Sequence, residues 1–358
     1  MGDNPVRLGL LRLTDAAPVI HAQASGLFGR EGVAVSLHVE PSWANIADKL
    51  AYGLLEGAVM LPPLALAMHL GLRGPPTPLI VPASLSLNGN SVVLASALAA
   101  TVLRGGHPSA MAVAQRLRGL LPGRMLRIAV VHAWSTHDLL VRYWLAAAEI
   151  DPDRDLRLVV LPPSAMVGAL AQGEIDGFCA GAPWGAVAAE AGVGRAVALS
   201  SGIWRNHPEK CLAVRTAWAE SCPAQLQSVL RALLQAGLDC DRGDRAASLA
   251  ALLAGPSLVD VPARLIEGSL PGGSATDSDR SVFAAHGAQM PDRAHAAWFL
   301  RQMARWRDLP PGAHDAVAIY RPDLQAAAAR QAGLMLVAPE PILPSNHADG
   351  AGTASCAH

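Results

Sequence analysis

The stretches "LAYGLLEGAVM" (50–60) and "LAQGEIDGFCA" (170–180) are related copies, 120 positions apart. Both carry a glycine, then an acid and a second glycine in the same register: Gly53, Glu56, Gly57 and Gly173, Asp176, Gly177. At the same offset "VRLGLL" (6–11) matches "LRIAVV" (126–131), and Pro63 matches Pro183. An offset this long does not fit a short-period solenoid, so the sequence predicts two copies of one unit of about 90 residues.

Each copy reads as strand, helix, strand, helix and strand. Strands are expected at 6–13, 33–40, 58–61, 125–131, 156–162 and 177–180, and helices at 14–28, 42–57, 136–150 and 164–176. Thr14 or Asp15 is expected to cap the first helix, and Ser42 the second. Strands that alternate with helices predict a parallel sheet with helices on both faces, so two copies predict an α/β fold of two lobes around a cleft.

Two segments, 84–98 and 192–204, are expected to connect the lobes and form a hinge. After the return, the chain reads as mostly helical over 215–335. The expected divisions are lobe one at 1–92, lobe two at 93–196, a return to lobe one with C-terminal helices at 197–337, and a disordered tail at 338–358.

The composition narrows the class of protein. Hydrophobic residues make up 51% of the 358 positions, and the formal net charge is −1. We therefore expect a large core, no direct nucleic-acid binding and no membrane insertion, because the longest apolar run (57–72) is short and broken by Pro62 and Pro63. The start of the chain lacks a secretory pattern, and the five cysteines are odd in number and widely spaced. A cytoplasmic location with reduced thiols is expected.

Candidate ligand contacts follow the strands, because ligands of open α/β sheets bind at the carboxyl ends of the strands. These positions are Thr14, Asp15, Pro41, Ser42, Trp43, Leu61, Pro62, Thr136, His137, Asp138, Pro162, Ser164, Gly181 and Ala182. His137 begins a helix, where an imidazole and the helix dipole can both favour an anion. Trp43 offers an aromatic face, and Asn45, Asn88, Asn90 and Asn206 lie in the same stretches although asparagine is scarce here.

One lysine stands out in the stretch "SGIWRNHPEKC" (201–211). Only Lys49 and Lys210 are lysines among the 28 basic residues. A metal site at His207 and Cys211 is disfavoured, because two more ligands are needed and Pro208 interrupts the helix that would align the pair. The sequence has no nucleophile elbow and no phosphate- or dinucleotide-binding loop, so we expect neither a cofactor nor an enzyme.

Five stretches carry a family resemblance: "EPSWANIADKLAYG", "LNGN", "THDLLVRYWLAAAEI", "GEIDGFCAGAPW" and "SGIWRNHPEKCLAVRTAW". They resemble the nitrate-binding solute receptors of ABC transporters (NrtA-like) and the related cytosolic nitrate/nitrite sensors of NasS type. The resemblance covers roughly residues 5–335 and implies a type II periplasmic-binding-protein-like fold.

The resemblance also implies a site for one nitrate. Its binding roles fall on Trp43, Asn90, His137, Gly181 and Lys210. Residues expected to support them are Asn45, Lys49, Asn88, Thr136, Pro183, Trp184 and His207. The chain reads Gly181-Ala182-Pro183-Trp184 where the family motif resembles "GEPW", so a negative charge is lost there.

A lysine at position 210 fits a small anion, because an ammonium is a compact charge with three donors whereas guanidinium is a wide planar fork. It argues for nitrate or nitrite and against bicarbonate, whose hydroxyl needs an acceptor. The main expectation is a cytosolic sensor that closes on nitrate or nitrite and releases a NasT-like antiterminator of ANTAR type, which would regulate nitrate-assimilation genes. The alternatives are the solute-binding component of a nitrate ABC transporter and a pyrimidine-synthase-like enzyme of the same fold.

Overall fold

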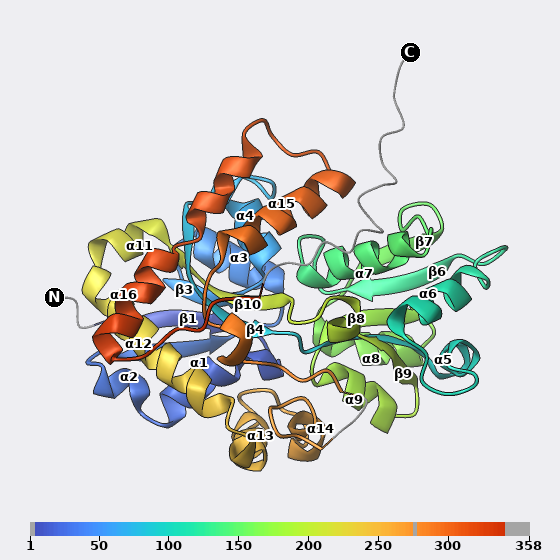
Figure 1. Cartoon of the computed structure of the whole chain (residues 1–358), viewed down its shortest axis with the longest axis horizontal. Helices are drawn as coiled ribbons and strands as arrows, with labels where there is room; N and C mark the ends of the chain where they lie inside the picture. The colour runs from blue at the N-terminus through green and yellow to red at the C-terminus, as the bar shows by residue number, and fades with distance from the viewer. Residues whose placement is uncertain (1–3, 275–277, 341–358) are drawn as a thin grey trace.

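The computed structural model describes residues 4–274 and 278–340, and it contains two five-stranded sheets (Figure 1). The first has the order β2-β1-β3-β10-β4 and the second the order β7-β6-β8-β5-β9. The first-sheet strands are β1 (Val6–Leu10), β2 (Val35–Val39), β3 (Gly57–Met60), β4 (Leu79–Leu87) and β10 (Pro208–Arg215). Those of the second are β5 (Asn90–Ala95), β6 (Leu126–Val130), β7 (Leu156–Val160), β8 (Gly177–Gly181) and β9 (Gly194–Leu199).

The sequence repeat survives as identical strand pairing. Leu8 of β1 pairs with Gly57 of β3, and Ile128 of β6 pairs with Gly177 of β8 at the same offset. The repeated acid forms the same clamp in both lobes. Glu56 accepts from the backbone N–H of Arg7 at 2.8 Å, and the matching bond from Arg127 to Asp176 is also 2.8 Å. These acids are repeated because each one anchors the start of the first strand of its lobe.

Both sheets are mixed, whereas the sequence pattern predicts parallel sheets. The repeats supply three parallel strands each, and the antiparallel strands come from the segments that cross between lobes. The strand β10 runs antiparallel to β3 and β4, and β5 runs antiparallel to β8 and β9. The crossing segments therefore finish the sheets as well as connecting them.

The lobes are covered by helices on both faces. Figure 1 shows α3 and α4 on one side of the first sheet, and α1 and α12 on the other. The first-lobe helices are α1 (Ala17–Ala24), α2 (Leu27–Arg30), α3 (Trp43–Ala51), α4 (Pro62–His69) and α11 (Thr216–Ser221). Those of the second are α5 (Ser96–Val102), α6 (Ala110–Arg118), α7 (Thr136–Ala147), α8 (Pro163–Ala171) and α9 (Trp184–Glu190).

The expected C-terminal helices are present and they contact both lobes. They are α12 (Pro223–Cys240), α13 (Ala246–Leu253), α14 (Ala263–Glu267), α15 (Arg293–Trp306) and α16 (Pro322–Ala332). Helix α12 packs on α1 and α16, whereas α15 contacts α4 in the first lobe and α7 in the second. Short 3-10 turns lie at Thr14–Ala16, Gly243–Arg245, Ala285–Gly287 and Ala313–Ile319. No helix in the described part of the chain is both long and apolar enough to cross a membrane.

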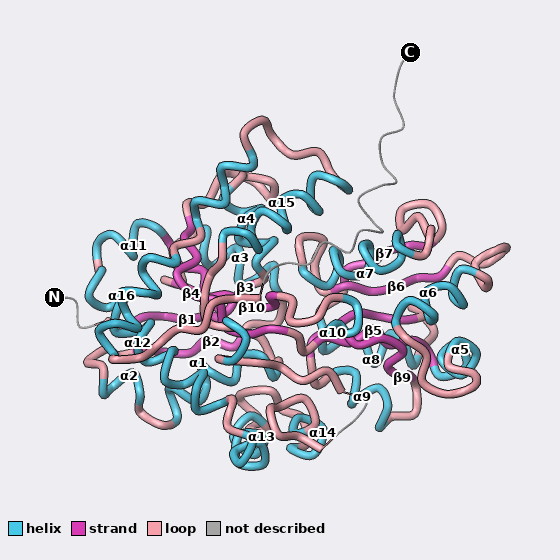
Figure 2. Tube along the Cα trace, in the orientation of Figure 1, coloured by secondary structure: helices cyan, strands magenta, loops and turns pink. Residues whose placement is uncertain are grey.

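The two crossings are short and lie next to each other. The first is the turn between β4 and β5 at Asn88 and Gly89, three residues before the boundary expected at 92/93. The second runs from α10 (Ser200–Ile203) to the start of β10. The backbone N–H of Asn88 donates to the carbonyl of His207 at 3.0 Å, which joins them. Figure 2 shows the two groups of strands joined by these loops.

The first crossing lies at Asn88 and Gly89 because of its backbone geometry. Asn88 has φ 59° and Gly89 φ 89°, a left-handed turn that asparagine and glycine tolerate best. A side chain at 89 would also lie 2.6 Å from Ser281 Oγ. Of the tail expected at 338–358, residues 341–358 lie outside the described residues, and Glu340 Oε1 accepts from His286 Nδ1 at 2.7 Å.

Candidate functional site

The five residues expected to bind a ligand come from both lobes and are all buried. Trp43 is the first residue of α3, and Lys210 lies on β10 of the same lobe. Asn90 begins β5, His137 lies in the first turn of α7, and Gly181 ends β8. The side chains of Trp43, Asn90, His137 and Lys210 have at most 1% exposed surface.

These residues converge on one cluster. Lys210 Nζ lies 5.5 Å from the centre of the Trp43 ring. Asn90 pairs with Gly181 across the second sheet. His137 Nε2 is 3.7 Å from Glu209 Oε1, which is too long for a hydrogen bond. The grouping predicted from the sequence is thus present, although two further carboxylates, Asp15 and Glu209, connect its members.

Lys210 is paired with those two carboxylates. Its Nζ donates to Glu209 Oε1 at 2.5 Å and lies 2.9 Å from Asp15 Oδ2. The sequence predicts Lys210 as a positive charge without a partner in the protein. The structure corrects that prediction, because two carboxylates already balance the charge. Two of its three N–H donors serve the carboxylates, which leaves one for a ligand.

A bulge brings Glu209 and Lys210 to the same place. Neighbours on a regular strand point to opposite faces. Here Pro208 pairs with Leu87 and Lys210 with Ser86, so two steps on β10 match one on β4. A β-bulge of this kind re-aims side chains. Sequence reasoning missed Glu209 because the pattern gives no sign of the bulge, although the residue lies beside the lysine it did select.

Asp15 reaches the cluster because it does not cap a helix. The sequence predicts a capping role for Thr14 or Asp15, but the chain forms a 3-10 turn there, and neither that turn nor α1 has a side-chain cap. Asp15 was noted at the end of the first strand and left out of the expected ligand set. Its carboxylate is 4% exposed and points to Lys210 instead.

The charges are set by burial and by one another. Burial alone would raise the pKa of Glu209, but the charge and the hydrogen bond of Lys210 oppose it, and that pKa is held at about 2. Burial raises the pKa of Asp15, and Lys210 opposes this only in part. Burial lowers the pKa of Lys210, but the two carboxylates more than reverse the effect. At neutral pH Glu209 and Lys210 are therefore both charged.

Burial also lowers the pKa of His137 to about 3, so its ring is neutral at neutral pH. Neither of its nitrogens has a hydrogen-bond partner among the described residues, and the same holds for Trp43 Nε1 and Thr136 Oγ1. Buried donors without acceptors are costly, so native structures rarely keep them unless a ligand or water is bound. Both lobes therefore contribute buried polar groups that a small polar ligand could satisfy.

Asn90 presents an acceptor to the cluster, not a donor. Its amide Nδ2 donates to Glu209 Oε2 at 2.6 Å, and a carboxylate requires that orientation of the amide. Its Oδ1 is left without a partner within the described residues. A Cβ on Gly181 would lie 3.4 Å from this Oδ1 and 3.2 Å from Asp15 Oδ2. The expectation that Asn90 offers amide donors to a ligand is thus corrected.

The residues expected to support the site divide into two groups. Asn45 is exposed, and its Oδ1 accepts from Ser42 Oγ at 2.5 Å beside the start of α3. Lys49 pairs with Glu40 at 2.6 Å, so its role is to neutralise that buried carboxylate. Both are occupied away from Lys210.

In the second group, Asn88 and His207 lie in the two crossings between the lobes. Asn88 Nδ2 donates to Asn206 Oδ1 at 3.3 Å. His207 Nε2 is 2.7 Å from Ser200 Oγ, which in turn donates to Asp279. His207 is thus a link between the return crossing and Asp279. Cys211 Sγ lies 3.6 Å from the Met60 carbonyl, so the two halves of the rejected metal pair have separate partners. Pro183 and Trp184 start α9 beside Gly181.

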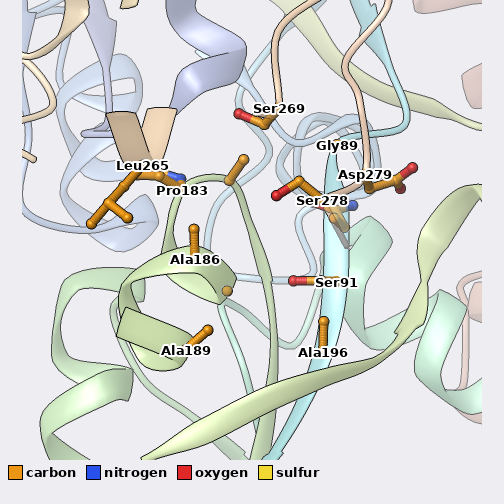
Figure 3. A pocket seen from close by; sticks show the side chains of 13 residues that line it. Gly89, Ser91, Pro183, Ala186, Ala189, Ala196, Leu265, Ser269, Ser278 and Asp279 are labelled. Atoms are coloured by element: carbon orange, nitrogen blue, oxygen red, sulfur yellow. The ribbon is translucent and has the colours of Figure 1, made fainter. Parts of the chain in front are cut away.

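Two pockets are lined by a residue of the cluster or by residues near its members in the sequence. One of about 140 Å³ is lined from both lobes by Leu11, Arg12, Leu13, Glu40, Pro41, Pro163, Ser164 and Trp184. These include residues two or three positions from Asp15, Trp43 and Gly181. A second, of about 20 Å³, lies beside Asn90 (Figure 3), where Ser278 and Asp279 face Ala186 and Ser91. The space between the lobes therefore borders the buried cluster.

The sequence of this chain is similar to those of several binding and transport proteins. The nitrate/nitrite binding protein NrtA of Synechococcus elongatus is 34% identical, with 93% of this chain and 80% of that protein covered. The bicarbonate transport ATP-binding protein CmpC of the same species is 35% identical over 85% of this chain and 46% of its own length. The chain spans about half the length of such ATP-binding relatives.

The structural comparison agrees. The crystal structure of the periplasmic nitrate-binding protein NrtA from Synechocystis PCC 6803 superposes with a TM-score of 0.84 at 28% identity, covering 91% of this chain and 88% of that one. The predicted two-lobed fold of periplasmic binding proteins is thereby confirmed. The NMT1-like family model matches residues 2–254. With its repeated lobes, its buried cluster and these relatives, the chain belongs to the NMT1-like family.

Proposed function

We propose that this chain binds nitrate or nitrite and serves as the solute-binding component of an ABC transporter. One observation carries the proposal: the two lobes contribute buried groups without partners in the described residues, Trp43 Nε1 and the His137 ring, with the Trp43 ring centre 5.5 Å from Lys210 Nζ. The named similarity to NrtA supports the same ligand. Nitrate accepts hydrogen bonds through three oxygens and has no proton to donate, so several donors around one aromatic face suit it.

Overall identity does not separate nitrate from bicarbonate, because a bicarbonate-transport relative is as similar as NrtA. A specific contact keeps bicarbonate as a second candidate. Asn90 Oδ1 is an unpartnered acceptor, which the hydroxyl of bicarbonate would satisfy and nitrate would not. The lysine argues for nitrate, as the sequence suggests, and the asparagine acceptor weakens that preference.

Calorimetric titration of the purified chain with sodium nitrate, nitrite, bicarbonate and chloride tests the ligand. We expect saturable binding of nitrate or nitrite and none of chloride. Tight bicarbonate binding without nitrate binding would replace the first candidate by the second. No heat and no rise in Tm with any of the oxyanions would reject the site itself.

The transporter and sensor roles share this binding step and differ in the partner. The relatives' names favour the transporter, and the similar solved structure is that of a periplasmic protein. The cytosolic sensor and its ANTAR-type antiterminator stay predictions. They require a complex that forms without nitrate and dissociates on its addition, which co-purification checks directly; a stable complex with an ABC permease instead supports transport.

The enzyme reading gains no support from the cysteines. Burial raises the pKa of the thiols of Cys179, Cys211 and Cys240, which keeps them neutral and poor as nucleophiles. The named relatives are binding and transport proteins.

A further inference from the structure

The buried cluster carries more negative than positive charge before any anion arrives. Asp15 and Glu209 are two carboxylates against the single ammonium of Lys210, and all three are at most 5% exposed. The groups facing them are His137 from α7 and His207 ahead of β10, both neutral, with Asp279 behind Ser200. A nitrate bound to the third N–H of Lys210 would therefore lie beside the ionised Glu209 and the Asp15 carboxyl in a medium of low dielectric.

We propose that nitrate enters this site together with one proton, and that Asp15 accepts that proton. The proposal rests on the function proposed above. The step balances simply: the nitrate keeps its charge and binds the third N–H of Lys210, while the Asp15 carboxylate takes H⁺ from solvent and becomes a neutral acid, so its contact with Lys210 is no longer an ion pair. Glu209 stays ionised and keeps its bond to Lys210.

Geometry distinguishes Asp15 from the other possible proton acceptors. Glu209 is held by donors on both oxygens, Lys210 on Oε1 and Asn90 on Oε2. Asp15 has only Lys210 as a charged donor, at 2.9 Å. Of the two carboxylates, Glu209 is thus the more fully held in its ionised form.

Burial also favours a proton on Asp15, because it raises the pKa of this carboxyl. His137 is the rival acceptor. It faces Glu209 across 3.7 Å, but its pKa is held at about 3, so it would have to be shifted far to protonate near neutral pH. At Asp15 the negative charge of nitrate would offset the Lys210 ammonium, which is the group that opposes the effect of burial on the pKa of this carboxyl.

The test is nitrate titration calorimetry in two buffers of different ionisation enthalpy, phosphate and Tris, at several pH values. We expect uptake of about one proton per nitrate, and an affinity that falls about tenfold for each unit of rising pH. In Asp15→Asn, which mimics the neutral acid, the uptake should vanish and the affinity should become independent of pH. The matched variant His137→Gln should bind more weakly and still take up the proton.

The outcomes separate the two proposals. If the heat of nitrate binding to the wild type is the same in both buffers, the proton inference alone is overturned. Proton uptake that persists in Asp15→Asn, or that is lost only in His137→Gln, overturns it as well. Absence of any nitrate or nitrite binding rejects the function and the inference together. Should Asp15→Asn not fold, an infrared difference spectrum of the wild type decides: nitrate should produce a protonated carboxyl band, and a spectrum without one contradicts the inference.

Discussion

The guanidinium of Arg307, just after α15, donates to Asp138 Oδ2 of α7 at 2.9 Å, and so joins the C-terminal helices to the second lobe. The same oxygen accepts from Arg142 at 3.0 Å. Arg307 also lies 4.8 Å from the ring centre of Trp134. Asp138 is buried and Arg307 is only partly exposed, so this ion pair is shielded from solvent.

Loss of this contact should favour separation of the lobes. We expect Arg307→Ala to lower the free energy of unfolding by about 1–3 kcal/mol, because a buried carboxylate loses one of its two charged donors. Nitrate affinity should fall as well, since the site takes donors from both lobes. Urea denaturation and calorimetry measure the two effects. Arg301→Ala, an exposed residue of the same helix, serves as control and should stay within about 0.5 kcal/mol.

Lys210→Ala should abolish nitrate binding and destabilise the protein. The substitution leaves Asp15 and Glu209 buried without their ammonium, and breaking a buried pair in this way costs about 3–5 kcal/mol. The other lysine provides the control. Lys49→Ala removes only the partner of Glu40, so it should retain nitrate affinity. Calorimetry on both variants, after a check of their melting, decides; Lys210→Ala with unchanged affinity would place the site elsewhere.

Gly181→Ala should weaken binding with little loss of stability. The added methyl group would lie 3.2 Å from Asp15 Oδ2 and 3.4 Å from Asn90 Oδ1, so the two side chains must shift by a few tenths of an ångström. Gly168→Ala in α8 is the matched control. Nothing lies within 4 Å of its Cβ position, and alanine in a helix is favoured by about 0.5–1 kcal/mol over glycine. Equal affinities in the two variants would contradict the role of Gly181.

Acid should destabilise the fold partly through His137. Its folded pKa of about 3 lies below the usual 6.5, so the unfolded chain binds the proton more readily. This contribution is fully present above pH 6.5 and is lost progressively as pH falls toward 3. From pH 7.5 to pH 5 we expect His137 to cost about 2 kcal/mol. Urea denaturation of the wild type and of His137→Gln at both pH values should show that much less loss in the variant; identical losses would assign the acid sensitivity to other groups.

The sequence was sufficient to predict the duplicated lobes, because a repeated acid and glycine mark a repeated backbone clamp at Arg7 and Arg127. It also selected Trp43, Asn90, His137, Gly181 and Lys210, which the fold brings together, while their role in binding stays a prediction. It could not indicate Glu209, because strand alternation places neighbours on opposite faces and only the bulge reverses this. The role of the Asn90 amide was likewise hidden, since its direction depends on a carboxylate 119 positions away.

The segment 84–98 was expected to connect the lobes, and the two sheets are joined within it. The left-handed turn at Asn88 and Gly89 ends β4 there, three residues before the expected bound at 92/93. The role of Asp15 was also missed. Aspartate is typical of helix caps, but Asp15 lies in a 3-10 turn ahead of the helix and pairs with Lys210 instead.

Asn90 follows directly on one crossing, and Lys210 lies three residues beyond the end of the other at His207. The residues proposed to bind the ion are thus close neighbours of the peptide units that must rotate if the lobes separate. We expect residence time and equilibrium affinity to be coupled in this protein. In a library randomised at 88–91 and 205–210, variants with a changed affinity for the ion should then also show a changed rate of dissociation.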